Sequence, residues 1–318
     1  MGVMHSMMSE YASLIKRFSL DKNETVYRMI LNLPGAGCEY WKRDGGCTMC
    51  GFHVATNKYT RGRLLSKWIF QLLYIMAQGF YLKNAPFELF VYNGGSFLND
   101  REIPVGFQDW FFKQVSMHKT IQSVMVENRC EYITQEKIEN AVQLLGGKKL
   151  YVGIGLESAN DYLRNNVIRK GLSLKVFEKK VRLVRANDAF VAAYVFLKPP
   201  GLNDEAALVD VVKTIQYALA VGVSEINVSC AFIQRQTEME RMYYDGEFIP
   251  PRLDIIVELI NIIIANSWPV SIGGFDDYPP PVAIPRNCDS CSENFYALIE
   301  RFREERVLGD IPICSCSS

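Results

Sequence analysis

Short apolar runs alternate six times with longer helical patterns along this chain. The apolar runs are nearly continuous, as is typical of parallel strands that are covered on both faces. Strands are expected within 26–35, 87–95, 123–129, 149–158, 189–201 and 225–233, and helices within 61–78, 106–117, 134–145, 173–187, 205–222 and 252–267. Right-handed crossovers wind such units into a complete or partial barrel. The sequence therefore predicts an α/β fold built on a partial (βα)6 barrel.

Two flanking segments complete the expected organisation. The pattern predicts an N-terminal helical segment over 1–24, the barrel over 25–278 and a short cysteine-containing extension over 279–318. The first residues lack the charged stretch and apolar core of a signal peptide. The longest apolar stretches are interrupted by charges and are too short to span a bilayer. We therefore expect a cytoplasmic protein with no membrane partner.

Positive and negative charges balance in this sequence. Lys plus Arg number 35, and Asp plus Glu also number 35. Proteins that hold nucleic acid by themselves usually carry a basic excess or a basic stripe. A nucleic-acid substrate would therefore need a local patch or a partner protein.

Three of the nine cysteines lie in "GCEYWKRDGGCTMCGF", residues 37–52, directly after the first expected strand. The clustering and the odd number of cysteines in a long chain favour metal binding over disulfides. A structural zinc ion needs four ligands, and His53 could supply the fourth. Alternatively, Cys38, Cys47 and Cys50 could hold a [4Fe–4S] cluster and leave one iron for a substrate or cofactor. The flanking glycines would let the loop wrap closely around such a cube.

Most expected strands end in a polar or glycine-rich segment. After the cysteine loop come "NGGS", "ENR", "GLES", "KPPG" and "IQRQTE". In barrels of this kind the carboxyl ends of the strands build the active site. The residues at these strand ends are therefore expected to lie together at one open end of the barrel, the mouth, and to form the active site there.

The cysteine triplet, "NGGS" after the second strand and "GLES" after the fourth resemble the radical S-adenosylmethionine (SAM) superfamily. The resemblance implies that the free iron of a [4Fe–4S] cluster binds SAM and that one electron cleaves SAM to methionine and a 5′-deoxyadenosyl radical. The usual spacing is Cys-x3-Cys-x2-Cys, whereas eight residues separate Cys38 from Cys47 here. The longer gap and "VENRCEYIT" are similar to the Elp3 branch. "GLESANDYLRNNVIRKGLSLKVFEK", "AAYVFLKPPGLNDEAALVDVVKTI" and "QRQTEMERMYYDGEFIPPRL" resemble the archaeosine-biosynthesis radical SAM family.

The resemblance implies SAM-binding roles at three strand ends. Ser96 stands where the family has an acid, so its contact with the SAM ammonium group would be weaker. Glu127 and Arg129 could bind the SAM carboxylate or pair with each other, while Glu157 and Ser158 would reach the ribose or the methionine end. The full set is Gly94, Gly95, Ser96, Glu127, Arg129, Glu157 and Ser158.

Substrate-facing residues are expected after the fifth and sixth strands. Lys198 lies at the tip of the fifth strand, and Gln234, Arg235 and Glu238 follow the sixth. We expect these four residues to face the mouth and to act on the substrate. A solvated loop before a helix is the alternative for the last three.

The resemblance also implies a reaction. In archaeosine formation the substrate is a lysine-bearing 7-deazaguanine in tRNA, and hydrogen abstraction from the lysine part would allow a carbon–nitrogen bond to break. A partner lysine transferase would supply the RNA-binding surface, and an external donor would supply the electron. A radical SAM enzyme acting on a small molecule is the alternative. The non-enzymatic alternative is a zinc-stabilised interaction module.

Four further cysteines lie near the end of the sequence, at positions Cys288, Cys291, Cys314 and Cys316. Together they could hold a second iron–sulfur cluster or a zinc ion. Reduced or redox-labile thiols are the alternative. Cys130 and Cys230 are expected to be buried apolar residues.

Overall fold

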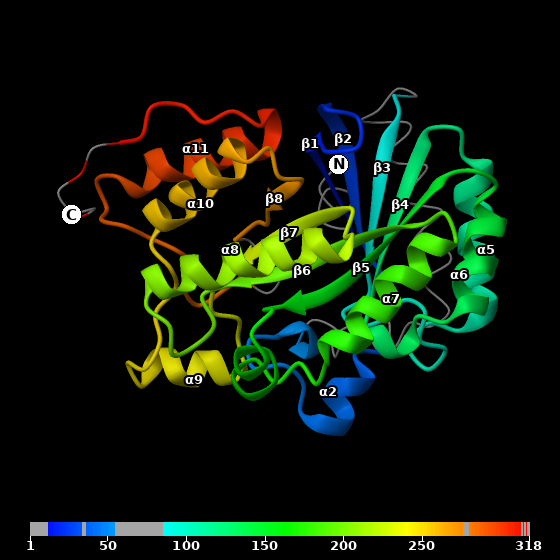
Figure 1. The fold of residues 1–318 in the computed structure, drawn as a ribbon, viewed down its shortest axis with the longest axis horizontal. Helices are drawn as coiled ribbons and strands as arrows, with labels where there is room; N and C mark the ends of the chain where they lie inside the picture. Colours follow the sequence, from blue (N-terminus) through cyan, green and yellow to red (C-terminus); the bar gives the residue numbers. More distant parts are fainter. Residues whose placement is uncertain are drawn as a thin grey trace, which may run out of the picture.

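The computed structural model describes residues 12–33, 36–54, 85–275, 280–312, 314 and 316 (Figure 1). The strands are β1 (Ala12–Ser19), β2 (Glu24–Asn32), β3 (Phe87–Tyr92), β4 (Ile121–Asn128), β5 (Lys149–Glu157), β6 (Phe190–Leu197), β7 (Glu225–Cys230) and β8 (Val270–Ile272). The helices are α2 (Glu39–Asp44), α5 (Val105–Met117), α6 (Gln135–Leu145), α7 (Leu174–Ala186), α8 (Asp204–Val221), α9 (Glu238–Tyr244), α10 (Leu253–Ala265) and α11 (Ser292–Glu305), with a 3-10 helix η2 (Cys130–Tyr132) and a π-helix η3 (Leu163–Val167). Within these described ranges, no helix combines the length and apolarity that crossing a membrane requires.

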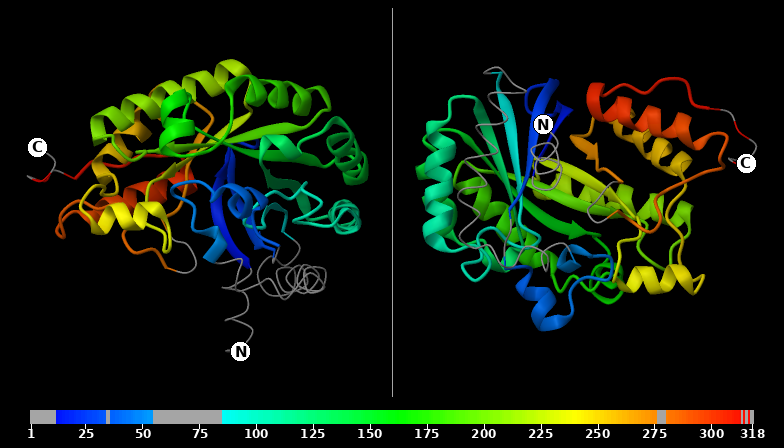
Figure 2. Two further views of the ribbon diagram at one scale, coloured as in Figure 1. Left: turned by 90° about the horizontal axis from the view of Figure 1, so that it is seen from below. Right: turned by 180° about the vertical axis from the view of Figure 1, so that it is seen from behind.

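The strands form one eight-stranded sheet in the order β1 to β8. Strands β2 to β8 pair in parallel. The sheet curls into an open half-barrel with α5, α6, α7 and α8 along its convex side (Figures 1 and 2). The expected α/β partial barrel is therefore confirmed. The helix expected over 61–78 lies outside the described residues.

The expectation of a helix over the first 24 residues is wrong for the part that the structure describes. Residues Ala12–Ser19 form β1, which pairs antiparallel with β2 from Ala12 opposite Leu31 to Ser19 opposite Glu24. Asn23, with a φ of 54°, closes the turn between them, and its N–H donates to the Ser19 carbonyl at 2.8 Å. The pairing satisfies the backbone groups along the outer edge of β2, which an amphipathic helix would leave open. Residues 1–11 lie outside the described part.

The helix α11 and the short strand β8 were not expected from the sequence. Phe295, Ile299 and Phe302 of α11 are buried in the main core. The same helix contacts both ends of the curled sheet, since Glu300 pairs with Arg17 of β1 at 2.7 Å and Arg303 donates to the carbonyl of Ile272 in β8 at 3.1 Å. The helix therefore bridges the two edges of the half-barrel.

The convex and concave faces of the sheet differ in chemistry. Leu150, Val152 and Ile154 of β5 belong to the main core, which the surrounding helices cover. Successive side chains of a strand point to opposite faces. Gly153 lies on the concave face, where an added Cβ would come within 3.0 Å of both Met125 and Tyr194. The small residue therefore leaves room for larger polar and aromatic groups inside the barrel.

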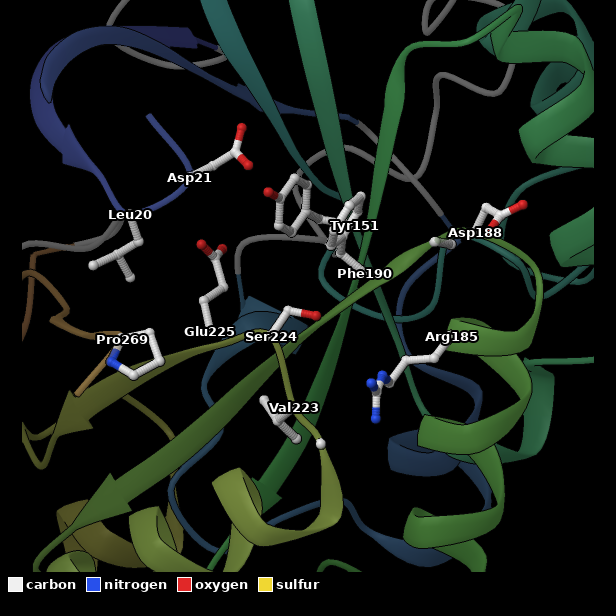
Figure 3. A pocket seen from close by; sticks show the side chains of 12 residues that line it. Leu20, Asp21, Tyr151, Arg185, Asp188, Phe190, Val223, Ser224, Glu225 and Pro269 are labelled. Carbon is white, nitrogen blue, oxygen red and sulfur yellow. The ribbon is translucent and has the colours of Figure 1, made fainter. Parts of the chain in front are cut away.

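A cavity of about 560 Å³ opens at the amino ends of β5, β6 and β7 (Figure 3). Tyr151 and Phe190 stack there with ring centroids 5.0 Å apart, and Asp21 and Glu225 also line the cavity. Burial raises the pKa of Glu225 from its ordinary 4.5 to about 7, although the nearby Arg28 opposes this shift. Because active sites of such barrels lie at the carboxyl ends of the strands, this cavity is at the wrong end to be the mouth.

The raised pKa of Glu225 predicts a stability change with pH. The folded protein binds the Glu225 proton more tightly than the unfolded chain, so the contribution is complete below pH 4.5 and is lost as pH rises through about 7. We expect this loss to reach up to about 3 kcal/mol in the free energy of unfolding. Glu225→Gln should flatten the pH dependence in denaturant titrations between these values. Glu258→Gln, a matched change at an exposed site on α10, should leave it unchanged. Equal slopes for all three proteins would contradict the assignment.

Candidate active site

The cysteine loop leaves the carboxyl end of β2, forms α2 and returns through two glycines. Cys38 precedes α2, and Gly45 and Gly46 follow it with φ values of 79° and 77°. An added Cβ at Gly46 would collide with the ring of Trp41. The tight return that brings Cys47 back therefore needs glycine at this position.

A second, smaller core holds the cysteine loop against the barrel. Cys47 and Met49 pack on a cluster that includes Ile168, Phe196 and Met239. Thr48 lies between these two loop residues and donates from its N–H to the carbonyl of Ile168 at 3.0 Å, while its own carbonyl accepts from the N–H of Met239 at 3.4 Å. The loop is thus fixed by two later segments, one after β5 and one after β7.

The three loop cysteines are half-buried and lie beside two cations. Burial raises the pKa of Cys38, Cys47 and Cys50. Lys170 and Arg129 are close enough to Cys47 for their charges to oppose that shift. Cationic neighbours stabilise a bound group that carries negative charge. A set of thiolates on a cluster would be such a group.

The loop cysteines and His53 do not surround one ion. Among the described residues, only the four cysteines near the chain end have ligand atoms that all lie within 4.8 Å of one another. The ring of His53 instead stacks on Trp41, with centroids 4.3 Å apart and an interplanar angle of 11°. A single zinc ion held by the loop and His53 would require these groups to rearrange.

Glu102 joins the cysteine loop to the glycine-rich loop after β3. One carboxylate oxygen accepts from the N–H of Glu39 at 3.0 Å and from Nδ2 of Asn99 at 2.9 Å. The other accepts from the N–H of Ser96. An added Cβ at Gly95 would collide with this carboxylate. Position 96 carries a serine rather than an acid, and the carboxylate of Glu102, six positions later in the sequence, lies beside it.

Ser96 and Arg129 are both engaged within the protein. The Ser96 hydroxyl accepts from the N–H of Arg129 at 3.1 Å. The Arg129 guanidinium pairs with Glu131 at 2.6 Å, donates to the carbonyl of Lys170 at 2.9 Å and lies 3.7 Å from the ring centroid of Tyr40. The suggested pair between Arg129 and Glu127 is replaced by these contacts.

Glu127 belongs to a polar group on the concave face. The hydroxyls of Tyr92 and Tyr194 lie 3.5 Å apart, and Tyr194 is 3.6 Å from the sulfur of Met125. Burial raises the pKa of both tyrosines, and the charge of Glu127 adds to the shift. A carboxylate and two phenols thus line the barrel below the cysteine loop.

The two residues at the end of β5 point in different directions. Glu157, with a φ of 64°, pairs with Lys170 at 2.7 Å beside the cysteine loop. The Ser158 hydroxyl instead donates to Asp210 of α8 at 2.9 Å. A register shift between Gly155 and Glu157 accompanies this change of direction. Glu157 thus lies at the mouth, whereas the hydroxyl of Ser158 points away from it and bonds to α8.

Lys198 lines a second cavity of about 490 Å³ at the carboxyl end of β6. Its ammonium pairs with Asp204 at the start of α8 at 2.8 Å and lies 5.9 Å from the ring centroid of Phe248. The residue has a φ of 70° and is only 5% exposed. Lys198 thus lies at the end of the strand, as expected, and pairs with Asp204; its action on a substrate stays a prediction.

Of the three expected residues after β7, one contacts the cysteine loop directly. The side-chain carbonyl of Gln234 accepts from the N–H of Gly51. Arg235 is exposed, and Glu238 pairs with Arg241 of its own helix at 2.9 Å. Gln234 is therefore a support of the loop, whereas Arg235 and Glu238 lie further out.

Sequence reasoning missed Glu102 and Lys170. Both are charged groups that contact the cysteine loop, which lies far from them in the sequence, and neither belongs to a recognisable short motif. An acid six residues after "NGGS" was the available signal for Glu102. For Lys170 the sequence offers no comparable signal, because only the fold brings it beside Glu157 and Cys47.

Comparisons with known proteins were made by sequence and by structure. No known protein family profile matches the chain. It is 26% identical to archaeosine synthase subunit beta of Methanosarcina acetivorans, over 88% of this chain and 80% of that protein. It is 25% identical to the protein of the same name from Thermococcus kodakarensis, over 73% and 70%. An uncharacterized protein of Methanocaldococcus jannaschii is also 25% identical, over 78% of this chain but only 66% of its own length.

Two solved structures share the fold. Elp3 of Methanocaldococcus infernus superposes with a TM-score of 0.54 and 17% identity, over 83% of this chain and 67% of that one. Methylornithine synthase superposes with a TM-score of 0.51 and 11% identity, over 77% and 63%. The chain is thus similar in sequence to archaeosine synthase beta subunits and shares its fold with Elp3 and methylornithine synthase, and these findings support the resemblance to an Elp3-like, archaeosine-related radical SAM family.

Proposed function

We propose that this enzyme cleaves SAM reductively at a [4Fe–4S] cluster held by Cys38, Cys47 and Cys50. We further propose that it takes a hydrogen atom from a lysine-modified 7-deazaguanine in tRNA, so that a carbon–nitrogen bond breaks and archaeosine forms. The observation that carries the proposal is the position of the three half-buried thiols after the carboxyl end of β2, beside Arg129 and Lys170.

The residues present fit a cluster and SAM. The three thiols are near one another without converging on one ion, and the loop has two cations beside it. When bound, a cluster of this type supplies the electron that cleaves SAM. Gly94 and Gly95 would present their backbone to SAM, with the Glu102 carboxylate as the nearby negative charge for its ammonium group. Arg129 and Lys170 would balance the negative charge of the cluster and the SAM carboxylate.

The concave face would hold the reacting part of the substrate. Glu127, Tyr92 and Tyr194 give this face a carboxylate and two hydroxyls, which suit the amino and carboxylate groups of the lysine part of the substrate. Lys198 and Asp204 at the second cavity would bind a more distant part of the same substrate. The role of these residues is to position a carbon–hydrogen bond and to exclude water.

A partner protein would complete recognition of tRNA. The chain has no net charge, so it lacks the basic excess that a free-standing RNA-binding enzyme would carry. The two named relatives are beta subunits, which implies a second subunit for them. We propose that a lysine transferase partner supplies the RNA-binding surface here, and that an external one-electron donor reduces the cluster.

A small-molecule substrate remains the second candidate. The same neutral surface and the enclosed polar groups of the concave face favour it. Incubation of the reconstituted enzyme, SAM and reductant with tRNA bearing the lysine adduct, with and without the partner transferase, separates the two. Archaeosine formed in this assay supports the tRNA substrate. SAM cleavage that the modified tRNA neither accelerates nor couples to archaeosine would contradict it.

Removal of the loop thiols should abolish iron binding at the mouth. We expect the Cys38→Ala/Cys47→Ala/Cys50→Ala variant to lose about four iron atoms per chain relative to the wild type after anaerobic reconstitution. It should also form no 5′-deoxyadenosine from SAM and reductant, as measured by chromatography. Cys230→Ala, which removes a buried thiol of β7, should keep both properties. Zinc without iron in the wild type, and no SAM cleavage, would contradict the proposal.

Glu102 should act as a positioning residue between the two loops. Glu102→Gln places an NH₂ group toward backbone and side-chain donors, so we expect the free energy of unfolding to fall by about 1–3 kcal/mol. The KM for SAM should rise, because the glycine-rich loop loses its anchor. Asp109→Asn is a matched change in α5, at a carboxylate that accepts an exposed hydrogen bond from Asn140 of α6. It should alter neither the free energy of unfolding nor the KM for SAM. An unchanged KM in a destabilised Glu102→Gln protein would restrict the residue to a structural role.

A further inference from the structure

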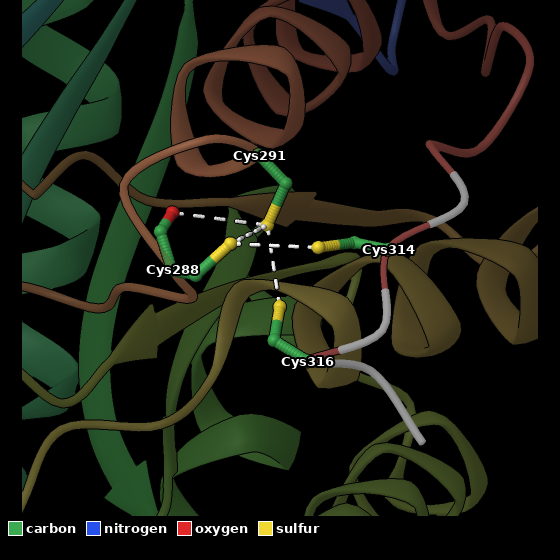
Figure 4. Close-up of side chains that lie close together, drawn as sticks. All are labelled: Cys288, Cys291, Cys314 and Cys316. Carbon is green, nitrogen blue, oxygen red and sulfur yellow. Dashed lines mark hydrogen bonds between the residues drawn. The ribbon is translucent and has the colours of Figure 1, made fainter.

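We propose that Cys288, Cys291, Cys314 and Cys316 bind one zinc ion in a tetrahedral thiolate site, separate from the mouth. The Cys288 sulfur lies 3.3 Å from that of Cys291 and 3.4 Å from that of Cys314, and the sulfurs of Cys291 and Cys316 are 3.4 Å apart (Figure 4). All four lie within 4.8 Å of one another. The four residues therefore surround a single point.

These separations match one ion better than a cluster or a disulfide. A zinc–sulfur bond of about 2.3 Å places the sulfurs of a tetrahedral site about 3.8 Å apart. In a [4Fe–4S] cube each cysteine binds a different iron, so its four sulfurs lie much further apart than around one ion. A disulfide would require a sulfur–sulfur distance near 2.05 Å. An all-thiolate tetrahedral set is a donor geometry typical of zinc.

The first two cysteines are held in a turn that precedes α11. The N–H of Cys291 donates to the Cys288 carbonyl at 3.3 Å, and the Ser292 hydroxyl donates to the same carbonyl at 2.8 Å. Asn287 fastens this turn to a second helix, since its side-chain oxygen accepts from the N–H of Leu253 in α10 at 2.7 Å. The turn is thus fixed by protein contacts alone.

The last two cysteines come from the tail that follows α11. Arg252, at the start of α10, donates to the carbonyl of Cys316 and holds the tail against the same helix end. The guanidinium of Arg252 also lies close enough to the Cys316 thiol for their charges to interact. On binding zinc, the four thiols would release their protons and form a group of net charge near −2. The nearby guanidinium offsets part of that charge.

The zinc ion would join the two tail cysteines to the turn before α11, the helix that contacts both edges of the half-barrel. The α11 helix joins β1 to β8, and α10 begins beside Asp204, the partner of Lys198. The N–H of Arg252 donates to Asp204 at 3.3 Å. The zinc site would therefore support the wall of the second cavity from outside.

Metal content in matched variants tests the site independently of the proposed reaction. The full chain, its Cys314→Ser/Cys316→Ser variant and the Cys38→Ala/Cys47→Ala/Cys50→Ala variant are purified without reconstitution, and zinc and iron are measured by mass spectrometry. We expect about one zinc per chain in the wild type and in the loop variant, and none in the tail variant. The tail variant should also unfold several degrees lower. Loss of zinc from the loop variant with retention in the tail variant would overturn the assignment.

Cobalt provides a second readout that does not depend on how the tail variant folds. Co²⁺ added to the metal-free loop variant should give the intense visible absorption of a tetrahedral thiolate complex, and zinc should displace it. A single iron, or four irons with sulfide, on the tail cysteines of the loop variant would overturn the choice of zinc. Tail cysteines recovered as disulfides with no bound metal would overturn the site itself.

Discussion

The common direction of strands β2 to β8 is the constraint from which the active site follows. Parallel pairing sends every carboxyl end to one edge of the sheet, so loops far apart in sequence meet there. The cysteine loop after β2 is contacted by segments after β5 and β7 for this reason. At the opposite edge lies the cavity that Glu225 lines, where burial raises the pKa of this carboxyl group. The parallel strand order thus places the candidate active site and this cavity at opposite ends of the strands.

The charged groups around the mouth are arranged in partnered sets. Glu102 accepts several N–H bonds, Glu157 pairs with Lys170, and Lys198 pairs with Asp204. A buried charge without a partner would cost several kcal/mol, and these partners offset that cost. The same contacts fix the loops relative to each other. A site built this way is organised before any ligand arrives.

The strand–helix units that the structure describes were predictable from the sequence, because continuous apolar runs and helical periodicity report burial directly. The sequence also located the cysteine triplet, whose spacing is visible in one line of sequence. It failed for β1, whose identity depends on pairing with β2, and for the partners of Arg129 and Ser158, which depend on contacts between distant segments. Short motifs show which residues reach a strand end. They do not show which way a side chain turns once the strand is distorted, as at Glu157.

The bridge made by α11 has a consequence for how the chain folds during synthesis. Arg17 of β1 and Glu300 of α11 are 283 positions apart, yet they pair across the gap between the sheet edges. The ribosome must therefore release nearly all of this sequence before the two edges can be joined. Within the described part of the chain, α11 packs beside β1, and a strand edge that is still uncovered readily pairs with other chains. The nascent chain is thus exposed to pairing at this edge until α11 has been synthesised.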